Sequence, residues 1–164
     1  MFSGFGKPVS ETSIGVPIET FEGEKRVALS PESVKRLKKD GFTINIQKGA
    51  GVGAGFLDAA YEAEGANIVD NAFKSDIVFK VRPPLESEYG KLEKDSGLIS
   101  YLYPKKDTKL VDELKSKNIS CYAMNEIPRL SRSQTYDALS SMANISGYKA
   151  VVEAASLFDR AFMG

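Results

Sequence analysis

Six short apolar segments, separated by stretches with helical patterning, constrain the fold of this 164-residue chain more than any other feature. Ser30 and Pro31 are suited to begin a helix after the first segment, and Asp107 is suited to cap another before the last. This alternation favours an α/β fold with a doubly wound, mostly parallel sheet of the Rossmann-like or flavodoxin-like kind. The predicted strands cover residues 13–17, 42–47, 66–69, 76–81, 97–101 and 119–124.

The pattern changes after residue 133. Residues 134–162 contain no proline and are rich in Ala, Leu, Met, Val and Ile, which predicts a helix longer than the usual length of about 8–20 residues. Its faces are apolar nearly all round, so it requires cover on most sides. We therefore expect a flexible lead-in over residues 1–12, an α/β domain over residues 13–130, and a long connecting helix over residues 131–164.

A glycine-rich loop over residues 48–56 has the spacing of a dinucleotide-binding fingerprint. Gly49, Gly51 and Ala54 satisfy G-x-G-x-x-G/A, and Asp70 lies about 20 residues downstream, where a ribose-binding acid is expected. Two polar residues nevertheless separate the strand from the first glycine, and acidic residues follow where a phosphate would approach. The sequence leaves two interpretations, a nucleotide-binding loop or an ordinary strand-to-helix turn.

A polar set lies where the long helix is predicted to begin. Gln134, Asp137 and Ser140 follow one another at intervals of three residues, which would place them on one helix face, and Arg129 precedes them on a loop. Together they suit a neutral polar ligand with an amide and hydroxyl groups, such as nicotinamide with its ribose. A structural alternative stands beside this, because Ser131 and Gln134 have capping-box spacing and Asp137 in the first turn favours the helix dipole.

The composition excludes several kinds of chemistry. Histidine is absent, so the chain has no Ser–His or Cys–His nucleophile and no imidazole metal ligand, and we expect no metal site. The single cysteine, Cys121, lies in an apolar run and is expected to be a buried, unreactive thiol. Basic and acidic residues number 22 each, which favours no nucleic-acid partner, and no apolar run is long enough for direct membrane insertion. Hydride transfer fits these limits, because a cofactor carries the reactive atom.

Four motifs carry a resemblance to a known family: EKRVALSPESVKRLKKDGF, GAGVGAGF, DIVFKVRPP and EIPRLSRSQTYDALSSMANISGYKAVVEAA. From about residue 15 to the end, the chain resembles the N-terminal domain of the NAD(H)-binding component, the alpha subunit, of proton-translocating NAD(P) transhydrogenase. The resemblance implies that Arg129, Gln134 and Asp137 contact and orient the nicotinamide, and that Ser140 assists. It also implies that a later dinucleotide-binding domain holds the pyrophosphate, so that the loop at Gly49 does not.

The resemblance further implies an activity and partners. The activity is hydride transfer between NADH and NADP⁺ coupled to proton translocation, with NAD(H) on this component and NADP(H) on a separate component. A membrane-spanning component would complete the enzyme, a homodimer is expected, and this fragment alone would be inactive. The domain would lie on the matrix side of a mitochondrial or other organellar inner membrane, or on the cytoplasmic side of a bacterial inner membrane.

Alanine dehydrogenase, whose N-terminal domain belongs to the same family, is the alternative interpretation. Its pyruvate-binding arginine and lysine match Arg26 and Lys80, for which ordinary charge pairing is an equally weighted structural explanation. Alanine dehydrogenase also uses a histidine as acid and base, and the aligned position here is Tyr103. A non-catalytic dimerisation module built on the long helix is a third possibility.

Overall fold

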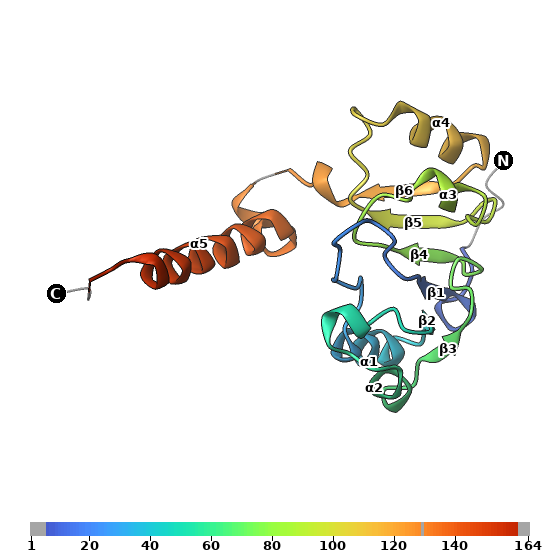
Figure 1. Ribbon diagram of the computed structural model, residues 1–164. Coiled ribbons are helices and arrows are strands. Elements are labelled where there is room, and N and C mark those ends of the chain that lie inside the picture. The colour runs from blue at the N-terminus through green and yellow to red at the C-terminus, as the bar shows by residue number, and fades with distance from the viewer. Residues whose placement is uncertain (1–5, 129, 161–164) are drawn as a thin grey trace. The chain divides into compact units, whose positions relative to one another are not determined.

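A six-stranded sheet organises the chain up to Ala123 (Figure 1). The computed structural model describes residues 6–128 and 130–160. The strand order is β3-β2-β1-β4-β5-β6, and every pair of neighbouring strands is parallel. All six predicted strands are confirmed, and with them the α/β fold class. The strands are β1 (Ser13–Val16), β2 (Thr43–Gln47), β3 (Asn67–Val69), β4 (Ile77–Phe79), β5 (Gly97–Ser100) and β6 (Ser120–Ala123).

Helices cover both faces of this sheet, as a doubly wound fold requires. In β4, Ile77 and Phe79 pack against a core that includes β1, β2 and the first two helices, whereas Val78 belongs to a second core with β5 and the later helices. Because successive strand residues point to opposite faces, the two cores lie on opposite sides of the sheet. The helices are α1 (Pro31–Lys39), α2 (Asp58–Ala63), α3 (Glu86–Tyr89) and α4 (Thr108–Ser116).

The predicted helix starts are confirmed by their caps. The Ser30 side chain accepts a hydrogen bond from the backbone N–H of Ser33 at 3.2 Å, and Pro31 occupies the first position of α1. The Asp107 carboxylate accepts one from the backbone N–H of Leu110 at 2.9 Å and so begins α4. These local signals fix where the chain turns from strand to helix.

The direction of winding reverses between β1 and β4. The chain adds β2 and β3 on one side of β1, then crosses to place β4, β5 and β6 on the other side. In open α/β sheets, ligands bind outside the carboxyl ends of the strands at such a switch point. The residues that follow β1 and β4 are therefore the ones to inspect for function.

A set of paired ions, four of them buried and two partly exposed arginines, lies at this switch point, in the segments after β1 and β4. We call it the switch-point ion cluster; its members are Glu19, Glu24, Arg26, Lys80, Arg82 and Glu88. The Lys80 Nζ atom lies 3.1 Å from a carboxylate oxygen of Glu88 and 3.4 Å from one of Glu19, and all three side chains are at most 3% exposed. Burial of an unpaired charge is costly, so these three charges require one another.

Glu24 joins the two arginines of the cluster. Its carboxylate accepts hydrogen bonds from Nε of Arg26 at 2.7 Å and from Nε of Arg82 at 2.8 Å, and its side chain is 4% exposed. The hydrogen bonds from the Arg26 guanidinium, helped by Arg82, lower the pKa of Glu24 from 4.5 to about 2. The loop after β1 is thus tied electrostatically to the end of β4.

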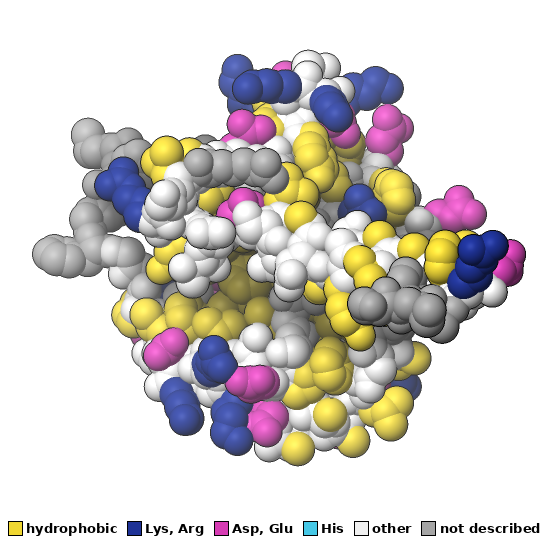
Figure 2. All heavy atoms as spheres, turned by 90° about the vertical axis from the view of Figure 1, so that its left-hand side faces the viewer, with side chains coloured by type: hydrophobic (Ala, Val, Ile, Leu, Met, Phe, Trp, Pro, Cys, Tyr) yellow, Lys and Arg dark blue, Asp and Glu magenta, His cyan; other side chains and the backbone are white. Residues whose placement is uncertain are grey.

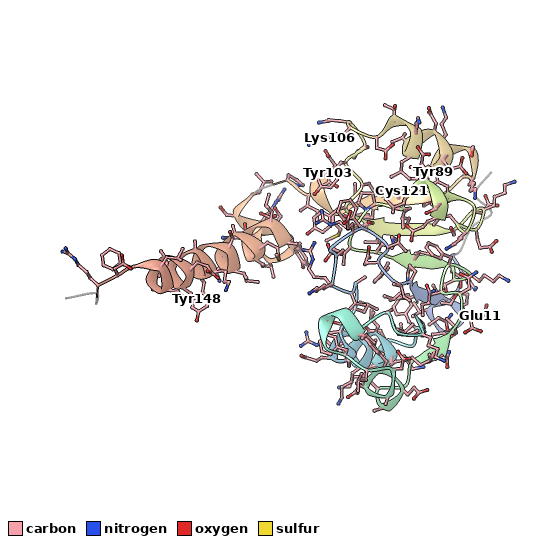
Figure 3. All side chains as sticks on the ribbon, viewed as in Figure 1. Glu11, Tyr89, Tyr103, Lys106, Cys121 and Tyr148 are labelled. Atoms are coloured by element: carbon pink, nitrogen blue, oxygen red, sulfur yellow. The ribbon has the colours of Figure 1, made fainter. Side chains whose placement is uncertain are left out.

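The second compact unit, Met124–Gly164, contains the long helix. α5 runs over Ala138–Leu157 and is preceded by a 3-10 helix over Ser131–Tyr136, so the prediction that a helix starts at residue 134 was wrong by four residues. Large apolar side chains are exposed along α5; Tyr148, which projects from the helix in Figure 3, is one of them. Among the described residues, no helix is long and apolar enough to cross a membrane.

Replacement of Gly15 by alanine should strongly destabilise the sheet. A Cβ atom there would lie 1.9 Å from the carbonyl oxygen of Ala72 and 2.7 Å from Oγ of Ser75, and central strand β1 cannot move away. We expect Gly15→Ala to lower the free energy of unfolding by about 3 kcal/mol in urea denaturation. Gly90→Ala is the control, because a Cβ atom at Gly90 meets nothing within 4 Å. Equal losses in the two variants would contradict this account.

Acid should weaken the link made by Glu24. Its folded-state pKa is depressed, so its stabilisation is fully present above its ordinary value of 4.5 and is lost as the pH falls towards about 2. Glu24→Gln should lower the free energy of unfolding by about 1–2 kcal/mol at pH 7, a value reduced because Arg26 and Arg82 are partly exposed to solvent. The difference from wild type should shrink between pH 4.5 and 2.

Denaturation curves measured across this pH range check the prediction. Glu22→Gln serves as the matched control, since Glu22 is an exposed neighbour. A destabilisation by Glu24→Gln that stays constant with pH would show that the ionised carboxylate is not what stabilises the loop.

Candidate functional site

A cavity in the second unit brings together three of the four residues predicted to contact nicotinamide. Gln134, Asp137 and Ser140 all line it, and its volume is about 390 Å³. The fourth predicted residue, Arg129, lies outside the described residues. The full lining is Leu130, Ser131, Gln134, Asp137, Ser140 and Ala143.

Asp137 is held at the first turn of α5. Its carboxylate accepts a hydrogen bond from the backbone N–H of Leu139 at 3.0 Å, which makes it the N-cap, and another from Oγ of Ser140 at 2.7 Å. Asp137 therefore stabilises the start of the helix, as the structural alternative proposed, but it does so as the N-cap residue and not as a residue of the first turn. The same two bonds fix the carboxylate against the cavity, where its oxygens are hydrogen-bond acceptors.

Gln134 is not used to cap its own helix. The capping partner is Ser133, whose Oγ accepts a hydrogen bond from the backbone N–H of Leu130 at 3.2 Å. The capping box expected between Ser131 and Gln134 is not formed; instead, the backbone N–H of Ser133 donates to the carbonyl oxygen of Leu130 at 2.9 Å, alongside the bond to the Ser133 hydroxyl. Among the described residues, the Gln134 side chain has no hydrogen-bond partner, so its amide donors and acceptor remain for a ligand.

The glycine-rich loop has a structural reason for its composition. A Cβ atom at Gly51 would lie 2.6 Å from the ring of Tyr61, and the Gly49 N–H donates to the Asp58 carboxylate at 2.9 Å. The loop follows β2, which does not border the switch point, and Asp70 is exposed after edge strand β3. These observations support the interpretation as an ordinary turn.

Arg26 and Lys80, the pair matched to a pyruvate site, both belong to the switch-point ion cluster. The Arg26 guanidinium donates to Glu24, and the Lys80 ammonium contacts Glu19 and Glu88. This agrees with the charge-pairing explanation. Sequence analysis did not identify Glu24 and Arg82 as members of this cluster. The two basic residues at alternate positions, Lys80 and Arg82, at the end of β4 could have indicated that Arg82 belongs to it.

Tyr103, at the position of the alanine dehydrogenase histidine, lies on the loop after β5. Its backbone φ is 46°, in the left-handed region that is uncommon for a non-glycine residue. Its ring stacks on Tyr101 with centroids 6.4 Å apart, and the Lys106 ammonium lies 5.8 Å from the Tyr103 centroid (Figure 3). The loop thus presents an aromatic pair and a cation at the carboxyl edge of the sheet.

The expectation that Cys121 is buried was wrong. Cys121 lies in edge strand β6 and is exposed, because no further strand among the described residues covers that edge. Partial burial nevertheless raises the pKa of its thiol, which disfavours the reactive thiolate and leaves no support for a nucleophile.

In the described part of the chain, no three His, Cys, Asp or Glu side chains are grouped so that they could hold a metal ion. On the face shown in Figure 2, Lys and Arg are interspersed with Asp and Glu.

Comparisons with known proteins identify relatives. Residues 15–146 match the model of the family described as alanine dehydrogenase/PNT, N-terminal domain. The chain is 46% identical over 155 residues to NAD(P) transhydrogenase subunit alpha of Cereibacter sphaeroides, an alignment that covers 92% of this chain. It is 33% identical over 150 residues to alanine dehydrogenase of Bacillus subtilis, with 90% of this chain covered.

The fold is shared with a solved relative. The crystal structure of transhydrogenase from Sinorhizobium meliloti superposes with a TM-score of 0.85 at 35% identity and covers 91% of this chain. This chain spans only 30% of the Cereibacter subunit, 39% of the Bacillus enzyme and 46% of the Sinorhizobium chain. The chain belongs to the alanine dehydrogenase/PNT N-terminal domain family, and within it is more similar to these transhydrogenase subunits than to the Bacillus alanine dehydrogenase.

Proposed function

We propose that this chain is the nicotinamide-positioning part of a proton-translocating NAD(P) transhydrogenase. The observation that carries the proposal is the cavity on which Gln134, Asp137 and Ser140 converge, in a chain similar to transhydrogenase alpha subunits. Arg129 lies outside the described residues and is included in the proposed site because its motif resembles that of the transhydrogenase family. The proposed reaction is hydride transfer between NADH and NADP⁺, coupled to proton movement across a membrane.

The side chains of the cavity fit a nicotinamide with its ribose. The Gln134 amide can exchange hydrogen bonds with the carboxamide of the ring, since both groups donate and accept. The Asp137 carboxylate, fixed by Leu139 and Ser140, can accept from a ribose hydroxyl. A volume of about 390 Å³ falls within the usual range of ligand pockets, about 300–1,000 Å³.

The work of these residues is orientation. A bound dinucleotide supplies the hydride, so no protein group is required as nucleophile, consistent with the absence of histidine. Gln134 and Asp137 restrict the rotation and translation of the ring before transfer. Such positioning can supply several kcal/mol of the barrier reduction, up to about 7–11 kcal/mol in well-oriented systems.

The remaining parts of the enzyme follow from this assignment. NAD(H) would bind this component, with its pyrophosphate on a dinucleotide-binding domain reached through α5, and NADP(H) would bind a separate component. The complete enzyme would include a membrane-spanning component and two copies of this chain. Its location would be the matrix side of an organellar inner membrane or the cytoplasmic side of a bacterial one.

Substitutions at the cavity should slow hydride transfer in the complete enzyme without unfolding the chain. We expect Gln134→Ala to lower kcat about tenfold, because the nicotinamide loses a side chain that orients it. The variant should remain folded, since the Gln134 side chain makes no hydrogen bond among the described residues. Asp137→Asn should keep the helix cap and weaken the grip on the ribose by a similar factor. Arg132→Ala is the control, since Arg132 is a neighbour that does not line the cavity. Unchanged kinetics in both cavity variants would remove this site assignment.

Titration of the chain alone with NADH tests the interpretation of the glycine-rich loop. We expect no saturable binding in the micromolar range, near −8 kcal/mol, because the Gly49 N–H is already bonded to Asp58. Calorimetry or fluorescence quenching makes the measurement. Clear micromolar binding by this chain would show that the loop, or another site in residues 1–164, holds the dinucleotide.

A further inference from the structure

We propose that the hydroxyl group of Ser131 is a further binding group of the cavity in the second unit, where it accepts a hydrogen bond from the carboxamide of the nicotinamide. This inference rests on the proposed function, because it extends the set formed by Gln134, Asp137 and Ser140. From the sequence, Ser131 is expected only as a partner in a capping box, which the structure does not form.

The lining of the cavity follows the sequence at intervals of three residues. Apart from Leu130, every lining residue belongs to the series Ser131, Gln134, Asp137, Ser140 and Ala143. The first two members lie in the 3-10 helix over Ser131–Tyr136. A 3-10 helix has three residues per turn, so side chains three positions apart are eclipsed on one face. Ser131 and Gln134 are therefore aligned along the face that borders the cavity.

Backbone hydrogen bonds continue this spacing into the first turn of α5. The N–H of Asp137 donates to the carbonyl oxygen of Gln134 at 3.3 Å, and the N–H of Ser140 donates to that of Asp137 at 3.1 Å. Both bonds join residues three positions apart, as in a 3-10 helix. An α-helix that began at Ser131 would instead rotate each member of the series by about 60° from the one before it. The 3-10 geometry thus keeps Ser131 beside the other polar groups.

The hydroxyl group of Ser131 is left for a ligand, since it makes no hydrogen bond among the described residues. Ser133, two positions later, provides the contrast. Its hydroxyl accepts from the backbone N–H of Leu130 at 3.2 Å and donates to the carbonyl oxygen of Pro128. Ser133 therefore anchors the preceding loop, and it is not among the residues that line the cavity. Of these two serines in one short helix, one has a structural position and the other borders the cavity.

The order of the series indicates which part of the ligand Ser131 meets. Side chains three positions apart in a 3-10 helix are separated by about 6 Å along its axis. In the proposed function Asp137 binds the ribose, and Gln134, the preceding member, binds the carboxamide of the ring. Ser131 lies one further step from the ribose end. It is therefore placed to reach the outer edge of the carboxamide.

The hydrogen-bonding groups of a carboxamide explain why a second protein group is needed there. A carboxamide has two N–H groups and one carbonyl oxygen. When it pairs with the Gln134 amide, which also donates and accepts, it uses one N–H and the oxygen. The second N–H then requires an acceptor, and the Ser131 oxygen supplies it. An N–H that leaves water without gaining an acceptor costs free energy, so loss of this hydroxyl should weaken binding.

Titration of the complete transhydrogenase with two reduced nucleotides tests the assignment. One is NADH, and the other is reduced acetylpyridine adenine dinucleotide, in which a methyl ketone replaces the carboxamide and removes both N–H groups. Calorimetry gives the dissociation constants, and rates of hydride transfer to NADP⁺ are measured beside them. We expect Ser131→Ala to raise the dissociation constant for NADH about fivefold and to leave that for the analogue unchanged.

Two further variants separate the hydroxyl from other effects of substitution. Ser131→Thr keeps the hydroxyl group and should restore NADH binding. Thr135→Val is the matched control, because it removes a hydroxyl from an exposed position of the same 3-10 helix that does not line the cavity. It should change neither dissociation constant. Ser131→Ala and Thr135→Val should both keep the melting temperature of the wild type, since neither hydroxyl makes a hydrogen bond among the described residues.

Two results would overturn this inference and leave the proposed function standing. One is an equal NADH dissociation constant in Ser131→Ala and Thr135→Val while Gln134→Ala slows hydride transfer. The other is an equal weakening of NADH and analogue binding by Ser131→Ala, which would show that the hydroxyl does not meet the carboxamide N–H. If instead neither Gln134→Ala nor Asp137→Asn changes hydride transfer, the proposed function is wrong and this inference falls with it.

Discussion

The burial of paired charges at the switch point is the constraint on which the functional end of the sheet depends. Lys80 and its two carboxylates are almost completely removed from solvent, and loss of one partner would leave an uncompensated buried charge. Glu19 and Glu24 both come from the loop after β1, while their partners at β4 come from a crossover later in the chain. The sheet places the carboxyl ends of β1 and β4 side by side, and the ion pairs then connect the segments that follow these two strands. The same pairs set the positions of Arg26 and Arg82.

Topology explains why the most conspicuous motif is not the best candidate site. A fingerprint binds pyrophosphate when its loop leaves a strand at the switch point and its N–H groups are open to the phosphate. Here the loop leaves β2, one strand away, and the Gly49 N–H is bonded to Asp58. Gly51 is required instead by the ring of Tyr61. In this chain, the glycine spacing of the fingerprint is therefore explained by packing against Tyr61 and not by binding of a nucleotide.

Much of the fold could be predicted because its signals are local: apolar runs gave the six strands, and Ser30 and Asp107 marked helix starts. The errors lie where the outcome depends on distant residues. The apolar run around Cys121 predicts a strand, but its exposure follows from the strand order, which no short segment encodes. Likewise, the pairing of Arg82 with Glu24 spans 58 positions, and neither residue is unusual in its own segment.

The start of α5 shows how a structural and a functional role can reside in one residue. The long apolar pattern alone could not locate the first turn, because Ser, Gln and Asp all occur where it begins. In the structure Asp137 ends the 3-10 helix and caps α5, and Ser140 in the next turn bonds back to it. The cap that stabilises the helix therefore also orients the carboxylate that lines the cavity. A ligand that bonds to this group meets acceptors already held in place, so little ordering free energy opposes binding. Since the cap and the cavity depend on the same atoms, evidence that Asp137 caps a helix does not argue against its role in binding.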